Sequence, residues 1–144
     1  MKVARAWDHP KPFVIELTVE SQHIDELGHT NNVHYLAWLQ ECTWQHSIHV
    51  GLSPENMLAT GCAMAVRNVH MQYLGATFVG DRLHVGDWIS ATDARLRATR
   101  TFQIVRQEDA RTVLRAEIEF ICINVESGRP KRMPPVFAER YTLS

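Results

Sequence analysis

The sequence has few of the features that mark disulfide-bonded, membrane-spanning or secreted proteins. Its three cysteines, Cys42, Cys62 and Cys122, are an odd number at wide spacings, which fits neither a disulfide framework nor a C-x-x-C zinc or redox motif. No apolar run approaches the ~20 residues that span a bilayer, and the N-terminus lacks an apolar run of signal-peptide length. We therefore expect a soluble, cytoplasmic protein with no membrane partner and with buried cysteines.

The sequence also lacks an excess of positive or negative charge. The formal net charge is −1 and the sequence pI is about 6.7, so nothing draws the chain toward phosphate backbones or anionic lipid. Nucleic acid is accordingly not an expected partner. The 144 residues are 45% hydrophobic, enough for one domain, residues 1–144, to bury a core without disulfides or metal.

Motifs for metal, nucleotide or serine chemistry are absent. There is no G-x-S-x-G elbow, and neither G-x-G-x-x-G nor G-x-x-x-x-G-K-[ST] occurs. Of the eight histidines, His23 and His29 share a loop with Asp25, while His46 and His49 lie about one helical turn apart. Neither spacing matches a zinc motif such as H-E-x-x-H, so we expect no metal and no cofactor, with His46 and His49 at a helix surface or interface.

The order of elements predicts an α+β domain. FVIELTVE, residues 13–20, alternates like a half-buried strand, and NNVHYLAWLQECTWQHSIHV runs to Gly51 as one helix of about 18 residues. Ser53-Pro54 begins a short helical turn. The remaining predicted strands are 62–74, 82–96, 101–108 and 112–125, with breaks at Gly80-Asp81, Ala98-Thr99 and 109–111. A long helix followed by an antiparallel meander predicts a sheet wrapped over a helix.

Two surfaces of this arrangement call for a partner or a site. The long helix is apolar on most sides, and its one polar stripe is formed by His34, Glu41 and Gln45. IEFICINV, residues 118–125, does not alternate, which predicts burial on both faces although one helix covers only one. We therefore expect another subunit on the second face. The basic, proline-rich tail at 127–135 is predicted to be a surface loop.

The loop before the long helix carries the strongest chemical signal. In IDELGHTNN, residues 24–32, Asp25 lies seven residues before Asn32 at the predicted helix start. A helix start offers unpaired N–H groups and a positive dipole end, which polarise a carbonyl and stabilise an oxyanion. A carboxylate beside it suffices for attack on an activated acyl group. The alternative is that Asp25 or Asn31 simply caps the helix.

These residues resemble a known family. Asp25-x-x-Gly28-His29-x-Asn31-Asn32-x-x-Tyr35, continuing Leu36-x-Trp38-Leu39-x-Glu41, is similar to the hotdog-fold thioesterases related to 4-hydroxybenzoyl-CoA thioesterase. The His29-x-Asn31-Asn32 part looks most like long-chain acyl-CoA thioesterases and plant acyl-ACP thioesterases. The resemblance implies a hotdog fold, an antiparallel sheet around one long central helix, and hydrolysis of an acyl-CoA to free acid and CoA.

The resemblance also implies roles for individual residues. Asp25 becomes the catalytic carboxylate, as nucleophile or as base for water, and the backbone N–H of Asn32 becomes the donor to the thioester oxygen. His29 is expected to shape the loop. Glu41 is a second candidate carboxylate, because another hotdog branch uses one on its helix. The further substrate-binding residues implied by the motif are Gly28, Asn31 and Tyr35.

Family assemblies, homodimers or homotetramers, place the site between subunits. The partner's strand from Val66 to Tyr73 is expected to complete the acyl pocket. In relatives, basic residues on the strand turn aligned with Arg97 to Thr101 hold the CoA phosphates, and Arg97 and Arg100 are the expected ones here. The basic tail offers further candidates, Arg129, Lys131 and Arg132.

Substrate identity stays open at the sequence level. Plant acyl-ACP enzymes carry an Asn where this chain has Leu27. This difference disfavours an acyl-ACP substrate, which stays an alternative. A non-catalytic hotdog oligomer that binds acyl thioesters is the other alternative. The aromatic side chains that could line an aliphatic tunnel, stack on an aryl group or cage a cation are Trp38, Trp44, Tyr73 and Trp88.

Overall fold

The computed structural model describes residues 3–143 and contains one antiparallel sheet, one long helix and several short helices. In chain order the principal elements are β1 (Phe13–Thr18), α1 (Asn32–His49), α2 (Pro54–Ala59), β2 (Cys62–Tyr73), β3 (Arg82–Thr92), β4 (Arg97–Arg106), β5 (Arg111–Asn124) and α3 (Pro135–Arg140). Two 3₁₀ turns, Val3–Arg5 and Ser21–His23, complete the set. None of the helices within residues 3–143 has the length and apolarity to cross a bilayer.

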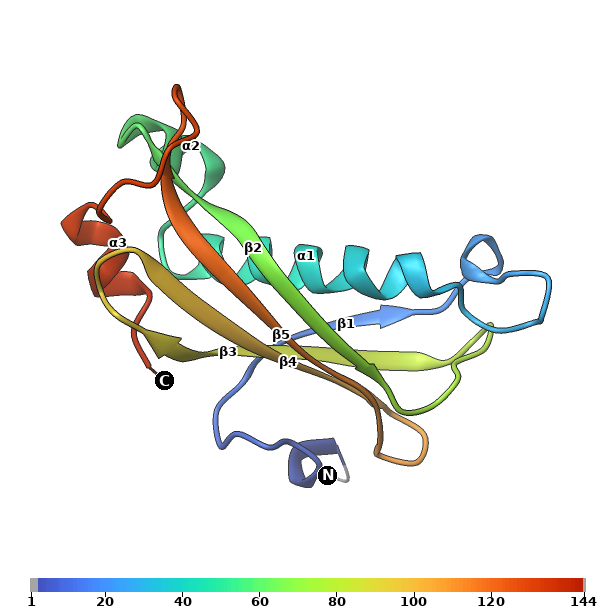
Figure 1. Ribbon diagram of the computed structural model, residues 1–144. Helices are drawn as coiled ribbons and strands as arrows, with labels where there is room; N and C mark the ends of the chain where they lie inside the picture. Colours follow the sequence, from blue (N-terminus) through green and yellow to red (C-terminus); the bar gives the residue numbers. More distant parts are fainter. Residues whose placement is uncertain (1–2, 144) are drawn as a thin grey trace.

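The strands form one sheet in the order β1-β3-β4-β5-β2, with every neighbouring pair antiparallel. Strands β1 and β2 are therefore the two edges, although they are separated in sequence only by α1 and α2. Helix α1 runs along one face of the sheet (Figure 1). This confirms the predicted α+β architecture of a sheet laid over one long helix.

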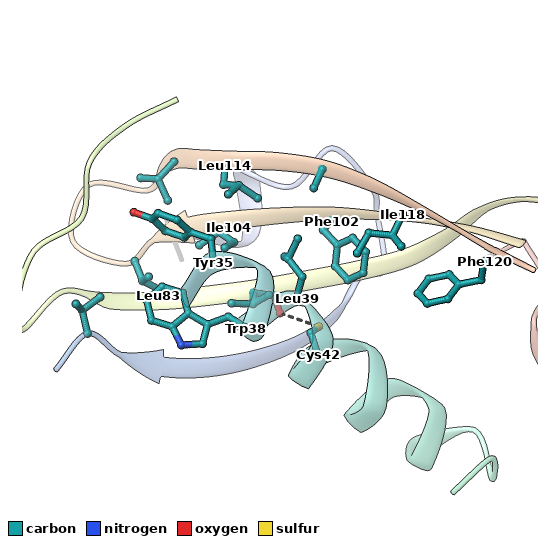
Figure 2. Close-up of a cluster of buried hydrophobic side chains, with 14 residues drawn as sticks. Tyr35, Trp38, Leu39, Cys42, Leu83, Phe102, Ile104, Leu114, Ile118 and Phe120 are labelled. Atoms are coloured by element: carbon teal, nitrogen blue, oxygen red, sulfur yellow. Dashed lines mark hydrogen bonds between the residues drawn. The ribbon is translucent and has the colours of Figure 1, made fainter. Parts of the chain in front are cut away.

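The core lies between α1 and the sheet, as Figure 2 shows. Leu39 and Cys42 of α1 are fully buried against Leu83, Phe102 and Ile118 of three strands. Side chains alternate across a strand, so each strand contributes every second residue to this core. The three cysteines are all buried as free thiols, which confirms that they behave as small apolar side chains.

The end of β5 has one buried face, not two. Ile118 and Phe120 are buried in the core beneath α1, and Cys122 is buried in a second cluster near Met57, whereas Ile121 and Ile123 on the opposite face are only half-buried. IEFICINV does not alternate in sequence because Ile121 and Ile123 occupy outer positions of a strand whose inner positions are also apolar. Within a single chain this strand therefore has one buried face, and the predicted cover of the other face by a second subunit stays a prediction.

The chain's own N-terminal segment covers the middle of the second face of the sheet. A Cβ added to Gly86 would lie 2.6 Å from Cζ3 of Trp7, so the indole packs directly on the glycine backbone. The rings of His9 and Trp88 stack with centroids 5.1 Å apart, and the buried Gln103 donates to the carbonyl of Ala6 at 2.8 Å. Part of the surface that we assigned to another subunit is therefore filled within the chain.

The turn between β3 and β4 lies earlier than the sequence predicted. It occupies residues 93–96, and the Oδ1 atom of Asp93 accepts the backbone N–H groups of Arg95, Leu96 and Arg97 at 2.8 to 3.0 Å. Ala98, which we placed in the break, is buried in β4. The side chain of Asp93, and not a glycine, stabilises this turn. The sequence therefore carried no glycine that would have marked its position.

A short C-terminal helix was also missed. Pro135 occupies the first turn of α3, a position that tolerates proline, and the helix follows directly after the predicted surface loop. Phe137 and Tyr141 are buried in a second apolar cluster with Met57 and Met133. The tail therefore closes the end of the sheet at which α2 lies.

Candidate active site

The loop before α1 is a tight, internally bonded turn. The Asp25 N–H donates to the His29 carbonyl at 2.9 Å, and the Gly28 N–H donates to the Asp25 carbonyl at 3.0 Å. Ile24 and Thr30 flank the turn as an isolated β-bridge. Gly28 has φ +83°, a conformation that side-chain-bearing residues rarely adopt, so glycine is required here by the backbone.

Asn31, and not Asp25, caps α1. The Oδ1 atom of Asn31 accepts the N–H of Val33 at 3.2 Å, whereas Oδ1 of Asp25 accepts the N–H of Leu27 at 2.9 Å within its own turn. Asp25 is half-buried. The capping alternative raised by the sequence is thereby assigned to Asn31, and the Asp25 carboxylate is left for another purpose.

The first N–H of α1 is free. The N–H groups of Val33 and His34 are taken by the side chain and carbonyl of Asn31, but the Asn32 N–H has no acceptor within residues 3–143. It carries the positive end of the helix dipole. Asn32 and Asp25 line one cleft, whose other walls are Leu27, His29, Thr30, Asn31, Tyr35 and residues 73–76.

Three buried hydroxyl groups hold together the segments that form this cleft. The Oγ1 atom of Thr77 lies 2.6 Å from Oγ1 of Thr30 and 2.8 Å from Oη of Tyr35. The Thr77 carbonyl also accepts the Thr30 N–H at 3.0 Å. Thr77 is fully buried, so it ties the turn and the first turns of α1 to the segment after β2. Sequence reasoning missed Thr77 because it lies 47 residues from Thr30 and belongs to no motif.

The remaining motif residues divide into two groups. His29 is exposed and lines the cleft, with its ring edge-on to Phe78 at 5.4 Å, in agreement with a role in shaping the loop. Glu41 accepts from the Gln45 amide at 3.1 Å and lines a different groove, beside β1. The chain therefore does not bring Glu41 to Asp25.

The candidates for CoA phosphates also separate. Arg97 is exposed at the start of β4, not on the turn itself, and lies at the end of the sheet far from the Asp25 loop (Figure 1). Thr101 faces the outer side of the sheet, where its hydroxyl donates to Ser90 at 2.7 Å. Arg100 is only 3% exposed. Its guanidinium is held in buried contacts within the chain, so the structure does not favour the phosphate contact that we predicted for it.

Arg100 belongs instead to a buried charged cluster that the sequence did not reveal. Its Nη1 atom lies 3.0 Å from Oδ2 of Asp87 and 2.7 Å from Nδ1 of His46. Nδ1 of His46 also lies 2.7 Å from Oδ1 of the fully buried Asp87. His46, predicted at a helix surface or interface, is half-buried between α1 and the sheet, whereas His49 is exposed.

Strand β2 presents an apolar edge. It pairs with β5 on one side only, within residues 3–143. Val66, Val69 and Tyr73 are 44%, 43% and 48% exposed, which is a high exposure for large apolar side chains in a row along one strand. The strand thus has both unpaired backbone groups and apolar side chains at the surface next to the cleft.

Comparison with known proteins gives consistent relatives. Residues 19–141 match the family model of the thioesterase-like superfamily. The long-chain acyl-CoA thioesterase FadM of Escherichia coli (strain K12) is 24% identical over 114 residues, which are 79% of this chain and 85% of that protein.

Solved structures share the fold. A 1,4-dihydroxy-2-naphthoyl-CoA thioesterase from Synechocystis superposes with a TM-score of 0.78 at 22% identity, over 89% of this chain and 95% of that chain. A Staphylococcus aureus protein determined in complex with CoA gives a TM-score of 0.83 at 22% identity, over 90% and 81% of the two chains. Since the family model covers most of the sequence, the chain belongs to the thioesterase-like superfamily and has the hotdog fold, as the motif around Asp25 predicted.

Proposed function

We propose that the protein hydrolyses acyl-CoA thioesters to a free acid and CoA in the cleft formed by Asp25 and the start of α1. The observation that carries this proposal is the free N–H of Asn32 in the same cleft as a carboxylate that caps nothing. A backbone donor at a helix N-terminus stabilises the oxyanion that develops when a thioester carbonyl is attacked. The match to the superfamily and the relation to FadM support the same chemistry.

The two groups have complementary tasks. The thioester oxygen accepts the Asn32 N–H, which makes the carbonyl carbon more electrophilic. One oxygen of Asp25 is held by the Leu27 N–H at 2.9 Å, and the other has no donor within residues 3–143. That second oxygen attacks the carbonyl carbon or orients a water that does. When Asp25 itself attacks, the C–S bond breaks to give an acyl-Asp25 anhydride and CoA thiolate, and water then hydrolyses the anhydride to the free acid and the Asp25 carboxylate. When water attacks, Asp25 accepts a proton from it, the C–S bond breaks, and that proton passes to the leaving CoA thiolate.

Labelled water detects an anhydride that is opened at the Asp25 carbonyl. Under single-turnover conditions in oxygen-18 water, an acyl-Asp25 anhydride opened at the Asp25 carbonyl leaves the label in the Asp25 carboxylate. Direct attack by water leaves it only in the product acid. Mass spectrometry of the peptide that contains Asp25 reads the difference.

We place the site at a homodimer interface built on β2. The unpaired edge of β2 and its apolar row, Val66, Val69 and Tyr73, suit pairing with a second copy of the strand. A twofold axis near the middle of β2 sets the end of one strand beside the start of the other. The partner's strand 66–73 then closes the cleft of Asp25.

The same geometry brings a basic cluster to the cleft from the partner. The tail is fastened beside the β3–β4 turn, because the Met133 N–H donates to the Arg95 carbonyl at 2.7 Å and the Lys131 N–H to the Cys122 carbonyl at 3.0 Å. Arg97, Arg129, Lys131 and Arg132 therefore share one end of the sheet. We assign the CoA phosphates to this cluster, in place of Arg100.

A thiol-release assay tests the function directly. The dimer is offered short, long, aromatic and cationic acyl-CoAs, with acyl-ACP at the same concentrations. We expect turnover of acyl-CoA and little of acyl-ACP, since Leu27 is 80% exposed where plant acyl-ACP enzymes carry an asparagine. Tight acyl-CoA binding without thiol release from any ester would instead identify a non-catalytic binding protein.

A further inference from the structure

A cavity separate from the Asp25 cleft lies between α1 and the sheet. It has about 470 Å³ of empty space, part of it open to solvent, and shares no lining residue with the cleft. Its walls are mostly apolar, with Met57, Met64, Ile89 and Phe120 among them. Such a cavity accepts an aliphatic or aromatic group but does not by itself orient one.

One wall of this cavity is formed by buried polar side chains. Arg100, Ser47 and Tyr141 line it and are 3%, 1% and 4% exposed. Nη2 of Arg100 donates to Oγ of Ser47 at 3.2 Å, and Oγ of Ser47 lies 3.3 Å from Oη of Tyr141. The Arg100 guanidinium carbon lies 5.4 Å from the centre of the Tyr141 ring. Three donors from α1, β4 and the C-terminal segment thus meet at one place.

This wall has hydrogen-bonding capacity to spare. A guanidinium carries five N–H donors, and the contacts to Asp87, His46 and Ser47 use three of them. The Tyr141 hydroxyl can take one more, which leaves at least one donor without an acceptor within residues 3–143. Burial raises the pKa of Tyr141, so its hydroxyl is protonated and able to donate at neutral pH.

The charge of the wall restricts what it binds. Asp87 is fully buried and lies 3.0 Å from Arg100, so the two formal charges offset one another. A second carboxylate placed here would meet a guanidinium that is already paired, and would lose its hydration without a matching charge. An uncharged oxygen needs only a hydrogen bond, which the spare guanidinium N–H or the hydroxyl proton not shared between Ser47 and Tyr141 supplies.

We propose that this cavity binds the far end of the acyl group and selects acyl chains that carry an uncharged oxygen there, a hydroxyl or keto group, over unsubstituted ones. The inference rests on the proposed function, with the thioester cleaved at the partner's Asp25. Antiparallel pairing of β2 sets this cavity, which Met64 and Val66 line near the start of the strand, beside the partner's Tyr73 at the cleft.

Matched esters test the selection. Hexanoyl-, octanoyl-, decanoyl- and dodecanoyl-CoA are compared with their ω-hydroxy and ω-carboxy counterparts by kcat/KM. Hydrogen bonds to a charged donor in a buried site are worth about tenfold to a hundredfold, so the ω-hydroxy ester of the best-fitting length should exceed its unsubstituted partner by that factor. Equal kcat/KM for the two at every length would overturn the proposal, as would preference for the ω-carboxy ester.

Hydroxyl deletions separate recognition from a purely structural role of the cluster. Tyr141→Phe and Ser47→Ala each remove one donor and keep the Arg100–Asp87 pair, with Ser90→Ala on the outer face as the matched control. We expect both variants to lower about tenfold the ratio of kcat/KM for the ω-hydroxy ester to kcat/KM for the unsubstituted ester. An equal loss for both esters would show that the cluster only stabilises the fold, and would contradict the proposal.

Binding to an inactive variant keeps this test independent of catalysis. The Kd values of the ω-hydroxy and unsubstituted esters are measured by calorimetry on Asp25→Asn. A tighter Kd for the ω-hydroxy ester supports the cavity assignment even if no ester is hydrolysed by the parent, a result that would refute only the proposed function. Equal Kd values together with normal hydrolysis would refute only the cavity.

Discussion

The Oδ1 atom of Asn31 accepts the N–H of Val33 at 3.2 Å and so provides the side-chain cap of α1. The cap satisfies the second N–H of the helix and leaves the first, on Asn32, in the cleft beside Asp25. One asparagine thus both ends the loop and determines which backbone donor is free for a ligand.

Replacing this cap should cost stability in a defined way. Asn31→Ala removes the acceptor for Val33 and is expected to lower the free energy of unfolding by about 1 kcal/mol, whereas Asn31→Asp retains an acceptor and should lose little. Urea denaturation of the two variants measures the difference. Equal stability of the alanine and aspartate variants would show that the cap contributes nothing.

The hydroxyl cluster under the cleft should matter for both stability and turnover. Thr77→Val keeps the shape of the side chain but removes the Oγ1 partner of Thr30 and Tyr35, at an expected cost of about 1–3 kcal/mol in the free energy of unfolding. The loop that holds Asp25 is then less firmly placed, so kcat should fall as well.

Thr77→Ser is the matched control, because it retains Oγ1 and loses only a methyl group. Thermal unfolding and kcat of this variant should lie much closer to those of the parent. A serine variant as impaired as the valine one would assign the role of Thr77 to packing and not to its hydroxyl.

The carboxyl group of Asp93, in the turn before β4, should titrate at an unusually low pH. Backbone N–H groups of Arg97, Leu96 and Arg95 lower the pKa of Asp93 from 3.8 to about 2. Because the folded pKa is the lower one, the carboxylate stabilises the turn above about pH 3.8, and this contribution is lost as the pH falls toward 2. NMR titration of the Asp93 carboxyl carbon reads the pKa; a midpoint near 3.8 would contradict the hydrogen bonds.

The β2 edge should control assembly. Val69→Lys places a charge in the apolar row of this strand and is expected to convert the dimer to a monomer, as measured by sedimentation. Val125→Lys, at an exposed apolar position outside β2, is the control that should remain dimeric. In the proposed dimer the partner's strand completes the cleft, so activity should be lost together with dimerisation. A fully active Val69→Lys monomer would refute the shared site.

The sequence predicted the parts of the fold that depend on local patterns. The helix between Asn31 and Gly51 and the alternation in β1 can be recognised from neighbouring residues alone. The predicted bounds of both elements were therefore close to those observed. The turn at Asp93 was placed too late, because hydrogen bonds from backbone N–H groups to the Asp93 carboxylate stabilise it in place of the glycine that usually marks a break. Helix α3 was missed because its proline-rich start is typical of a loop.

The site divides along the same line. Asp25, Gly28 and Asn31 lie within nine residues, and a local motif identified them. The contacts of Thr77 with Thr30, and of Arg100 with Asp87 and His46, join positions far apart in the chain, and only the paired strands bring them together. We assigned Arg100 to the CoA phosphates because its position in the sequence does not show that its side chain lies on the buried face of the sheet.

The most direct test of the central claim is the turnover of Asp25→Asn on the best acyl-CoA substrate, measured by thiol release. Glu26→Gln, a neutralised neighbour that is exposed, is the matched control. We expect kcat of Asp25→Asn to fall by several orders of magnitude with thermal stability and dimerisation unchanged, while Glu26→Gln behaves like the parent. An Asp25→Asn dimer that hydrolyses acyl-CoA at the parental rate would contradict it.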